Sequence, residues 1–182
     1  MTLRKALVLT VIPLLFFLSS TSGCSFSPKG PQIPVLYRHG FTARAEGTDG
    51  DGQVLYRSSL RYENGCLTVV TQEPSRLTLT ICGEEQRLFS ADNAPVQIPA
   101  SILTPWRGLA ELMALTADEA YWQQPRAEAG VLCYTFARAD GLQAEVQLDE
   151  TGLSLLGASI RFRDCITVWR FTDFTYLPAP QE

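Results

Sequence analysis

The side chains that could carry chemistry in this chain are few. The 182 residues include five cysteines and one histidine, His39, which lies in a proline-rich stretch. A single histidine there provides neither a His-based triad nor a clustered metal site. The sequence also lacks zinc-type spacing of its cysteines, a phosphate-binding glycine loop and a G-x-S-x-G turn. Acid pairs such as Asp118 and Glu119 fall at helix starts or turns, which leaves catalysis by scattered carboxylates as the alternative. We therefore expect no enzymatic activity, no catalytic residue, no metal and no cofactor.

Cys24 has the clearest chemical context of the five cysteines. Two basic residues precede an apolar run over 6–18 that is too short to span a bilayer. Residues 19–24, Ser-Ser-Thr-Ser-Gly-Cys, resemble a bacterial lipobox. The resemblance implies a lipoprotein signal peptide over 1–23, palmitate or a similar acyl group on the Cys24 thiol, and attachment to the outer side of a cell membrane. An ordinary secretory signal and an uncleaved anchor are the alternatives.

The composition describes one globular domain with flanking segments. Cleavage before Cys24 would leave 159 residues with 13 basic and 19 acidic side chains, a net charge of −6. An acidic exterior disfavours nucleic acid as a partner. We expect a proline-rich, extended tether over 24–39, a domain over 40–177 and a short tail over 178–182.

Period-two alternation and hairpin turns dominate the chain between 40 and 176. Asn64-Gly65 predicts a two-residue hairpin that pairs Leu67 with Tyr62, and the turn at Pro74 pairs Leu67 with Ile81. Both turns place the same side chains on one apolar face of a meander. That face comprises Tyr56, Leu60, Tyr62, Leu67, Val69, Leu77, Leu79 and Ile81.

A helical insert interrupts the strands. Thr104-Pro105 predicts a helix start, with Thr104 as N-cap, and Thr116 to Glu119 reads as a capping box for a shorter helix that continues through Trp122. Trp122 lies beside two glutamines, and we expect it to be partly exposed and available to a protein partner.

Strands resume near residue 130. Asp140-Gly141 predicts a turn that places Val131, Cys133, Thr135 and Ala137 opposite Ala144, Val146 and Leu148. Arg163-Asp164 predicts a last hairpin, with Leu156, Ala158, Ile160 and Phe162 beside Cys165, Thr167, Trp169 and Phe171. About four strands, a helical insert and about four strands indicate an α+β fold. We expect a strongly curved antiparallel sheet, a half β-barrel, with the short helical insert covering its concave face.

This order resembles the LolA/LppX superfamily of bacterial envelope proteins over residues 40–176. The resemblance rests on the opening strand at 40–43, the long meander, the insert at 99–122 and the closing run from 148–152 to 174–176. It implies a LolA-like half barrel whose concave side binds a lipid or acyl chain. Relatives such as the GerS-type germination lipoproteins imply the alternative, a protein-interaction scaffold that supports a cell-wall enzyme such as an amidase. The expected ligand-binding residues are Tyr56, Leu60, Tyr62, Val69, Leu79, Trp106 and Trp169, and the alternative for the two tryptophans is an ordinary core.

The remaining four cysteines fall in the predicted domain. The Pro74 register places Cys66 opposite Cys82 on the polar face, with Cα atoms ~4.5–5.5 Å apart, within reach of a disulfide. Two free thiols are the alternative. We expect Cys133 and Cys165 to be buried free thiols.

Overall fold

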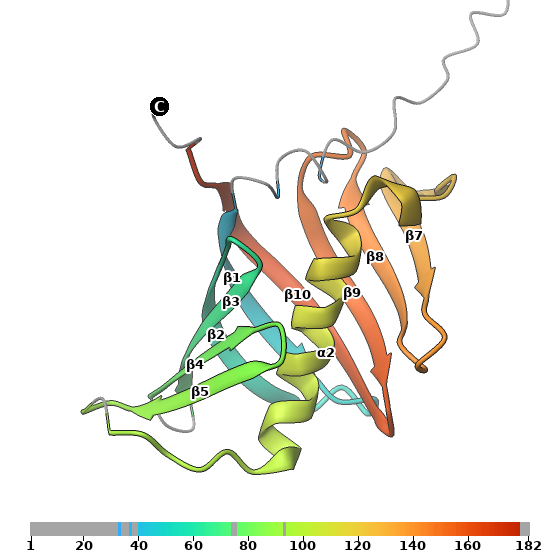
Figure 1. The fold of residues 1–182 in the computed structure, drawn as a ribbon. Helices are drawn as coiled ribbons and strands as arrows, with labels where there is room; N and C mark the ends of the chain where they lie inside the picture. Colours follow the sequence, from blue (N-terminus) through green and yellow to red (C-terminus); the bar gives the residue numbers. More distant parts are fainter. Residues whose placement is uncertain (1–32, 34–36, 38–39, 74–75, 93, 179–182) are drawn as a thin grey trace, which may run out of the picture.

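The computed structural model describes residues 33, 37, 40–73, 76–92 and 94–178. These residues form one ten-stranded antiparallel sheet that is not closed, with the order β5-β4-β3-β2-β1-β10-β9-β8-β7-β6. Figure 1 shows the sheet bent around helix α2, which lies in its hollow. The expected curved antiparallel sheet with a helical insert on its concave side is therefore confirmed. The elements are β1 (Phe41–Thr48), β2 (Val54–Glu63), β3 (Cys66–Glu73), β4 (Leu77–Cys82), β5 (Glu85–Ser90), α2 (Ala100–Thr116), η1 (Glu119–Tyr121), β6 (Arg126–Glu128), β7 (Val131–Ala137), β8 (Gln143–Asp149), β9 (Leu155–Phe162) and β10 (Cys165–Tyr176).

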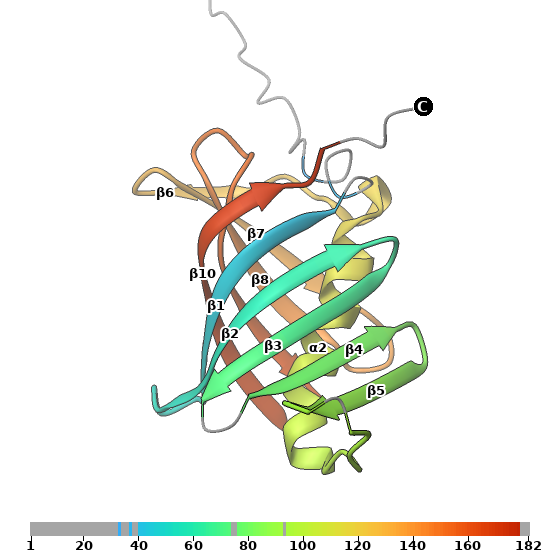
Figure 2. The same ribbon diagram turned by 90° about the vertical axis from the view of Figure 1, so that its left-hand side faces the viewer.

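The first half of the sheet has the predicted register. Tyr62 pairs with Leu67, and Leu67 pairs with Ile81 on its other side. Asn64 and Gly65 both have positive φ, as a two-residue hairpin of this kind requires. Figure 2 shows β2, β3 and β4 side by side, with α2 behind them. One apolar face therefore runs without a break across β2, β3 and β4.

The register of the β7–β8 hairpin is shifted by one residue from the prediction. Asp140 and Gly141 belong to a five-residue loop over 138–142, closed by a hydrogen bond from the Arg138 N–H to the Leu142 carbonyl (2.9 Å). The shift turns Leu132, Tyr134 and Phe136 toward the hollow, opposite Leu148, Val146 and Ala144. Cys133 therefore faces away from the helix, although its neighbours still bury it.

The β9–β10 hairpin follows the prediction at its closed end. Phe162 pairs with Cys165, and Ala158 pairs with Trp169. Near Leu156 the prediction fails, because a register irregularity in the β8–β9 ladder leaves the Leu156 side chain 39% exposed. Bulges of this kind cannot be read from alternation alone.

Helix α2 begins earlier than predicted. It starts at Ala100 with Pro99 as its N-cap, so Thr104 and Pro105 lie inside the first turns. The Thr104 hydroxyl donates to the Ala100 carbonyl (2.8 Å), and the carbonyl that Pro105 leaves without a donor belongs to exposed Ser101. Water can satisfy that carbonyl, which explains why the helix tolerates the proline.

The predicted capping box is also corrected. Thr116 is the last, buried residue of α2, and Asp118 caps η1 by accepting a hydrogen bond from the Ala120 N–H (2.9 Å). The expected second helix is a single 3-10 turn, Glu119–Tyr121, and Trp122 follows it.

Two residues of the predicted tether belong to the domain. Ile33 and Tyr37 have helical backbone conformations and are buried in the core. Tyr37 contacts the rings of Phe41 and Tyr62, with centroid distances of 5.2 and 6.0 Å. An extended tether is therefore wrong at these two positions. The rest of the predicted tether, the predicted signal peptide and Cys24 lie outside the described residues.

Within the described part of the chain, no helix combines the length and apolar character needed to cross a membrane.

Candidate functional site

The predicted ligand-binding residues all face the hollow of the sheet. Tyr56, Leu60 and Tyr62 lie on β2, and Val69 and Leu79 lie on β3 and β4. Every one of the seven is buried except Tyr56, which is half-buried. The structure thus brings the predicted residues to one face but places them in the protein's own core.

Three aromatic rings meet where α2 crosses β2 and β10. The centroids of Trp106 and Trp169 are 4.5 Å apart, and Tyr56 lies 5.2 Å from Trp106 and 6.2 Å from Trp169. Both tryptophans are 0% exposed, and neither indole N–H has a hydrogen-bond partner among the residues that the structure describes. The Trp169 ring packs on Gly47, where an added Cβ would lie 2.6 Å from a ring carbon. Burial raises the pKa of the Tyr56 hydroxyl.

A second aromatic cluster fills the other end of the hollow. Phe41 lies 5.7 Å from Tyr62 and 4.8 Å from Phe174 between ring centroids. Tyr37 joins the cluster and shares a side-chain hydrogen bond with Thr116 at the end of α2. Burial raises the pKa of Tyr37 well above its ordinary value, so this hydroxyl stays neutral.

Helix α2 supplies the side chains that fill the space between the two clusters. Leu109, Leu112 and Met113 are all fully buried, and the helix packs on β9 and β10. Gly108 permits the close approach, since a Cβ there would lie 3.1 Å from the Phe162 Cβ. Between the two clusters, the described part of the chain therefore occupies the hollow with its own side chains.

Ion pairs hold the outer side of α2 to both rims of the sheet. Arg138, after β7, donates to Glu111 on the helix (2.9 Å) and to both carboxylate oxygens of Asp140 (2.9 and 2.6 Å). Arg107 pairs with Glu84 at the tip of the β4–β5 hairpin. The hydrogen bonds from Arg138 lower the pKa of Asp140 to about 2, and the same bonds raise the pKa of Arg138. We call Arg107, Glu111, Arg138 and Asp140, with Glu84, the helix clasp.

Trp122 is partly exposed, as predicted, and its own contacts fix its position. It is half-buried, its indole N–H donates to the Thr116 carbonyl (2.8 Å), and its ring meets Tyr134 and Phe136 edge-on at 4.7 and 5.0 Å. The adjacent Tyr121 is the exposed aromatic residue here, with 44% of its surface accessible.

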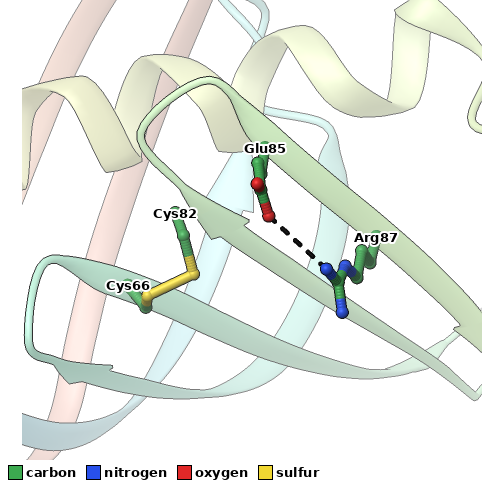
Figure 3. Close-up of a disulfide and its surroundings, with 4 residues drawn as sticks. All are labelled: Cys66, Cys82, Glu85 and Arg87. Atoms are coloured by element: carbon green, nitrogen blue, oxygen red, sulfur yellow. Dashed lines mark hydrogen bonds and ion pairs between the residues drawn. A yellow bond between two sulfur atoms is a disulfide. The ribbon is translucent and has the colours of Figure 1, made fainter.

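Cys66 and Cys82 are joined by a disulfide on the polar face, at directly paired positions with Cα atoms 4.3 Å apart. Figure 3 shows it beside the Glu85–Arg87 ion pair of the next strand. Cys133 and Cys165 are free; Cys133 is buried, and Cys165 is half-buried with its sulfur 3.4 Å from the Thr167 hydroxyl. The disulfide therefore ties β3 to β4 at the end of the sheet that carries the Asn64-Gly65 turn.

The structure also has an outer-face hollow that sequence reasoning missed. It is lined by Arg44, Ala45, Glu46, Arg57, Ser58, Ser59, Gln72, Arg170 and Thr172. Alternation places these arginines on the polar side, but only the register brings three strands' arginines together. In the described ranges no three histidine, cysteine or acidic side chains gather as a metal site, and His39 lies outside them.

No family model matches the chain, and no curated protein matches it. Among solved structures, the chain is similar to the crystal structure of MucB in complex with MucA(peri), at 17% identity and a TM-score of 0.42. The match covers 83% of this chain and 55% of that one, so this chain spans about half the length of the MucB chain. A structure of PNGF-II matches at 11% identity and a TM-score of 0.35, over 78% of this chain and 28% of that one. Both TM-scores lie below 0.5, so neither likeness establishes a shared fold.

Proposed function

We propose that the protein is a membrane-anchored, non-enzymatic envelope lipoprotein that acts as a protein-interaction scaffold. The filled hollow carries this proposal. Leu109, Leu112 and Met113 take the place that an acyl chain would need, and the helix clasp ties α2 to both rims. A domain of this kind binds through its outer surfaces. The LolA/LppX resemblance makes a cell-wall enzyme such as an amidase the expected partner.

A second candidate, lipid binding in the hollow, is favoured by one observation. The indole N–H groups of Trp106 and Trp169 are buried without a partner in the described part of the chain, and a buried donor in that state costs about 1–3 kcal/mol. A polar atom of a bound lipid would satisfy it. Such a ligand would have to displace α2 from the aromatic cluster first.

A crosslink across the helix separates the two candidates. The Cβ that Gly108 would carry lies 3.1 Å from the Phe162 Cβ, so Gly108→Cys with Phe162→Cys places two thiols close enough to form a disulfide after a small shift. We expect the oxidised variant to keep its capacity to crosslink to a specific envelope protein in cells. Phe162→Cys alone is the matched control, because it has the same missing ring and no crosslink. Loss of the partner in the locked variant, with the control unaffected, would favour a mechanism in which α2 moves.

Anchoring is tested separately. Cys24→Ser should block incorporation of labelled palmitate, because the thiol is the proposed acyl acceptor. Continued labelling would contradict the lipobox interpretation, and with it the proposed attachment to the membrane through Cys24.

A further inference from the structure

The outer-face hollow gathers three guanidinium groups from three neighbouring strands. Arg57 lies on β2, Arg44 on β1 and Arg170 on β10. In register, Glu46 pairs with Arg57 on one side and with Arg170 on the other. The hollow encloses about 450 Å³, and Glu46 is the one acid among those lining residues whose side chains the structure describes. A local excess of positive charge thus lies on a chain whose overall charge is negative.

The arginines of the hollow differ in how far their charges are neutralised. Arg57 pairs with Glu46 (Nε–Oε2 3.2 Å), and Arg44 pairs with Asp173 (Nε–Oδ2 3.2 Å) outside the lining. Arg170 makes no ion pair within the residues that the structure describes. Its guanidinium is therefore available to an anion, and the exposed Arg44–Asp173 pair contributes little that a ligand would have to replace.

Two irregularities in strand pairing border the hollow. Opposite the adjacent residues Arg57 and Ser58 of β2, the β3 strand carries one extra residue, Gln72, which lines the hollow. Opposite the β1 segment from Thr42 to Arg44, the β10 strand also carries one extra residue. Asp173 lies at this point and has a φ of 53°. Bulges bend a strand and redirect its side chains, and they are frequent next to binding sites. These two bring amide, hydroxyl and guanidinium groups around one depression.

We propose that this hollow binds a phosphate group. Donors from three strands surround it, and a phosphate offers oxygens in three directions, whereas a carboxylate offers two in one plane. Ser59 and Thr172 add hydroxyl groups beside the arginines. Arg170 is the anchoring residue, with Arg44 and Arg57 on either side. A free phosphate and the phosphodiester of a lipid headgroup share this chemistry, and the site does not depend on the scaffold proposal.

Calorimetric titration of the full chain in a neutral detergent tests the site. The probes are inorganic phosphate, glycerophosphoglycerol as a deacylated lipid headgroup, and acetate, all at constant ionic strength because exposed charges are screened by salt. We expect a phosphate probe to bind and Arg170→Gln to raise its Kd roughly tenfold, as the loss of a charge-assisted hydrogen bond predicts. Arg44→Gln is a second hollow variant with the same expected direction. Arg87→Gln is the matched control, an exposed, ion-paired arginine on β5 outside this hollow.

The outcomes are distinct. Tighter binding of glycerophosphoglycerol assigns the site to a lipid headgroup, and tighter binding of inorganic phosphate assigns it to the free ion; both support the proposal if the hollow variants weaken binding. Acetate binding as tight as phosphate, no binding of either phosphate probe, or equal Kd values for wild type, Arg170→Gln and Arg44→Gln would overturn it.

Discussion

The two faces of the curved sheet use the same alternating sequence in opposite ways. On the concave face, side chains from the strands and from α2 pack against one another, and Trp106 and Trp169 lie at 0% exposure. On the convex face, arginines that alternate with those core residues surround an open hollow. The comparison teaches that the apolar face of this half barrel stabilises the fold, whereas the polar face keeps a guanidinium group, that of Arg170, without an ion pair in the described residues.

The largest expected effect is on the concave face. Trp106→Ala should lower the free energy of unfolding by about 3–5 kcal/mol, because it removes a fully buried ring that packs on both Tyr56 and Trp169. Urea unfolding followed by fluorescence measures it. Val168→Ala, on the outer face and 37% exposed, is the control and should change stability by less than about 0.5 kcal/mol. Similar losses in both variants would erase the distinction between the faces.

The disulfide stabilises the convex face at one end of the sheet. Replacing both Cys66 and Cys82 with serine should cost about 3 kcal/mol, as expected for a crosslink that closes a loop of 16 residues. The same unfolding measurement applies, with Cys165→Ser, a free thiol, as the control. Non-reducing peptide mapping should recover a linked 66–82 pair, and four alkylatable thiols at 66, 82, 133 and 165 would contradict the bond.

A smaller effect is expected where the backbone touches the aromatic cluster. Gly47→Ala places a Cβ 2.6 Å from the Trp169 ring, which is trapped by its neighbours, so the variant should lose about 1–3 kcal/mol. Gly50→Ala, with no atom within 4 Å of the added Cβ, is the matched control. Equal stability of the two variants would show that the Trp169 ring is free to move.

The smallest effect concerns the helix clasp. The pKa of Asp140 falls from 3.8 to about 2 on folding, so its contribution to stability is present above pH 3.8 and is lost as the pH falls toward 2. Asp140→Asn should flatten that part of the curve of unfolding free energy against pH. Asp164→Asn, at an exposed carboxylate of the β9–β10 turn with no ion pair in the described ranges, is the matched control. If the unfolding free energies of the wild type and both variants fell equally between pH 3.8 and pH 2, the predicted contribution of Asp140 would be contradicted.

The sequence predicted the first half of the fold well because its turns are short. Asn64-Gly65 permits one register for β2 and β3, and the turn at Pro74 gives the register of β3 and β4, so the apolar face of these three strands follows from the two turns. Asp140-Gly141 looks equivalent but lies in a five-residue loop that Arg138 closes through its backbone and side chain, and alternation cannot reveal that extra length. The helix start was predicted too late because Pro105 is typical of a first helical position, whereas here it lies inside the helix and leaves only the carbonyl of exposed Ser101 without a donor.

The candidate sites were predictable only in part. Alternation correctly assigned the ligand-binding residues to one face, but whether that face stays open depends on α2, Ile33 and Tyr37, whose packing no local pattern specifies. Ile33 and Tyr37 were missed because prolines surround them in the sequence. The outer-face hollow depends on two bulges, at Gln72 and Asp173, and no local sequence pattern predicts them.

Native mass spectrometry of the chain without residues 1–24, after incubation with a total lipid extract, tests the central claim most directly. If the concave hollow is closed by the protein's own side chains, the domain should have its unliganded mass, or retain only a lipid that the crosslink between residues 108 and 162 does not remove. Retention of one phospholipid or glycolipid per chain, lost in the oxidised Gly108→Cys, Phe162→Cys variant and kept in Phe162→Cys, would contradict the claim and identify the hollow as a lipid site.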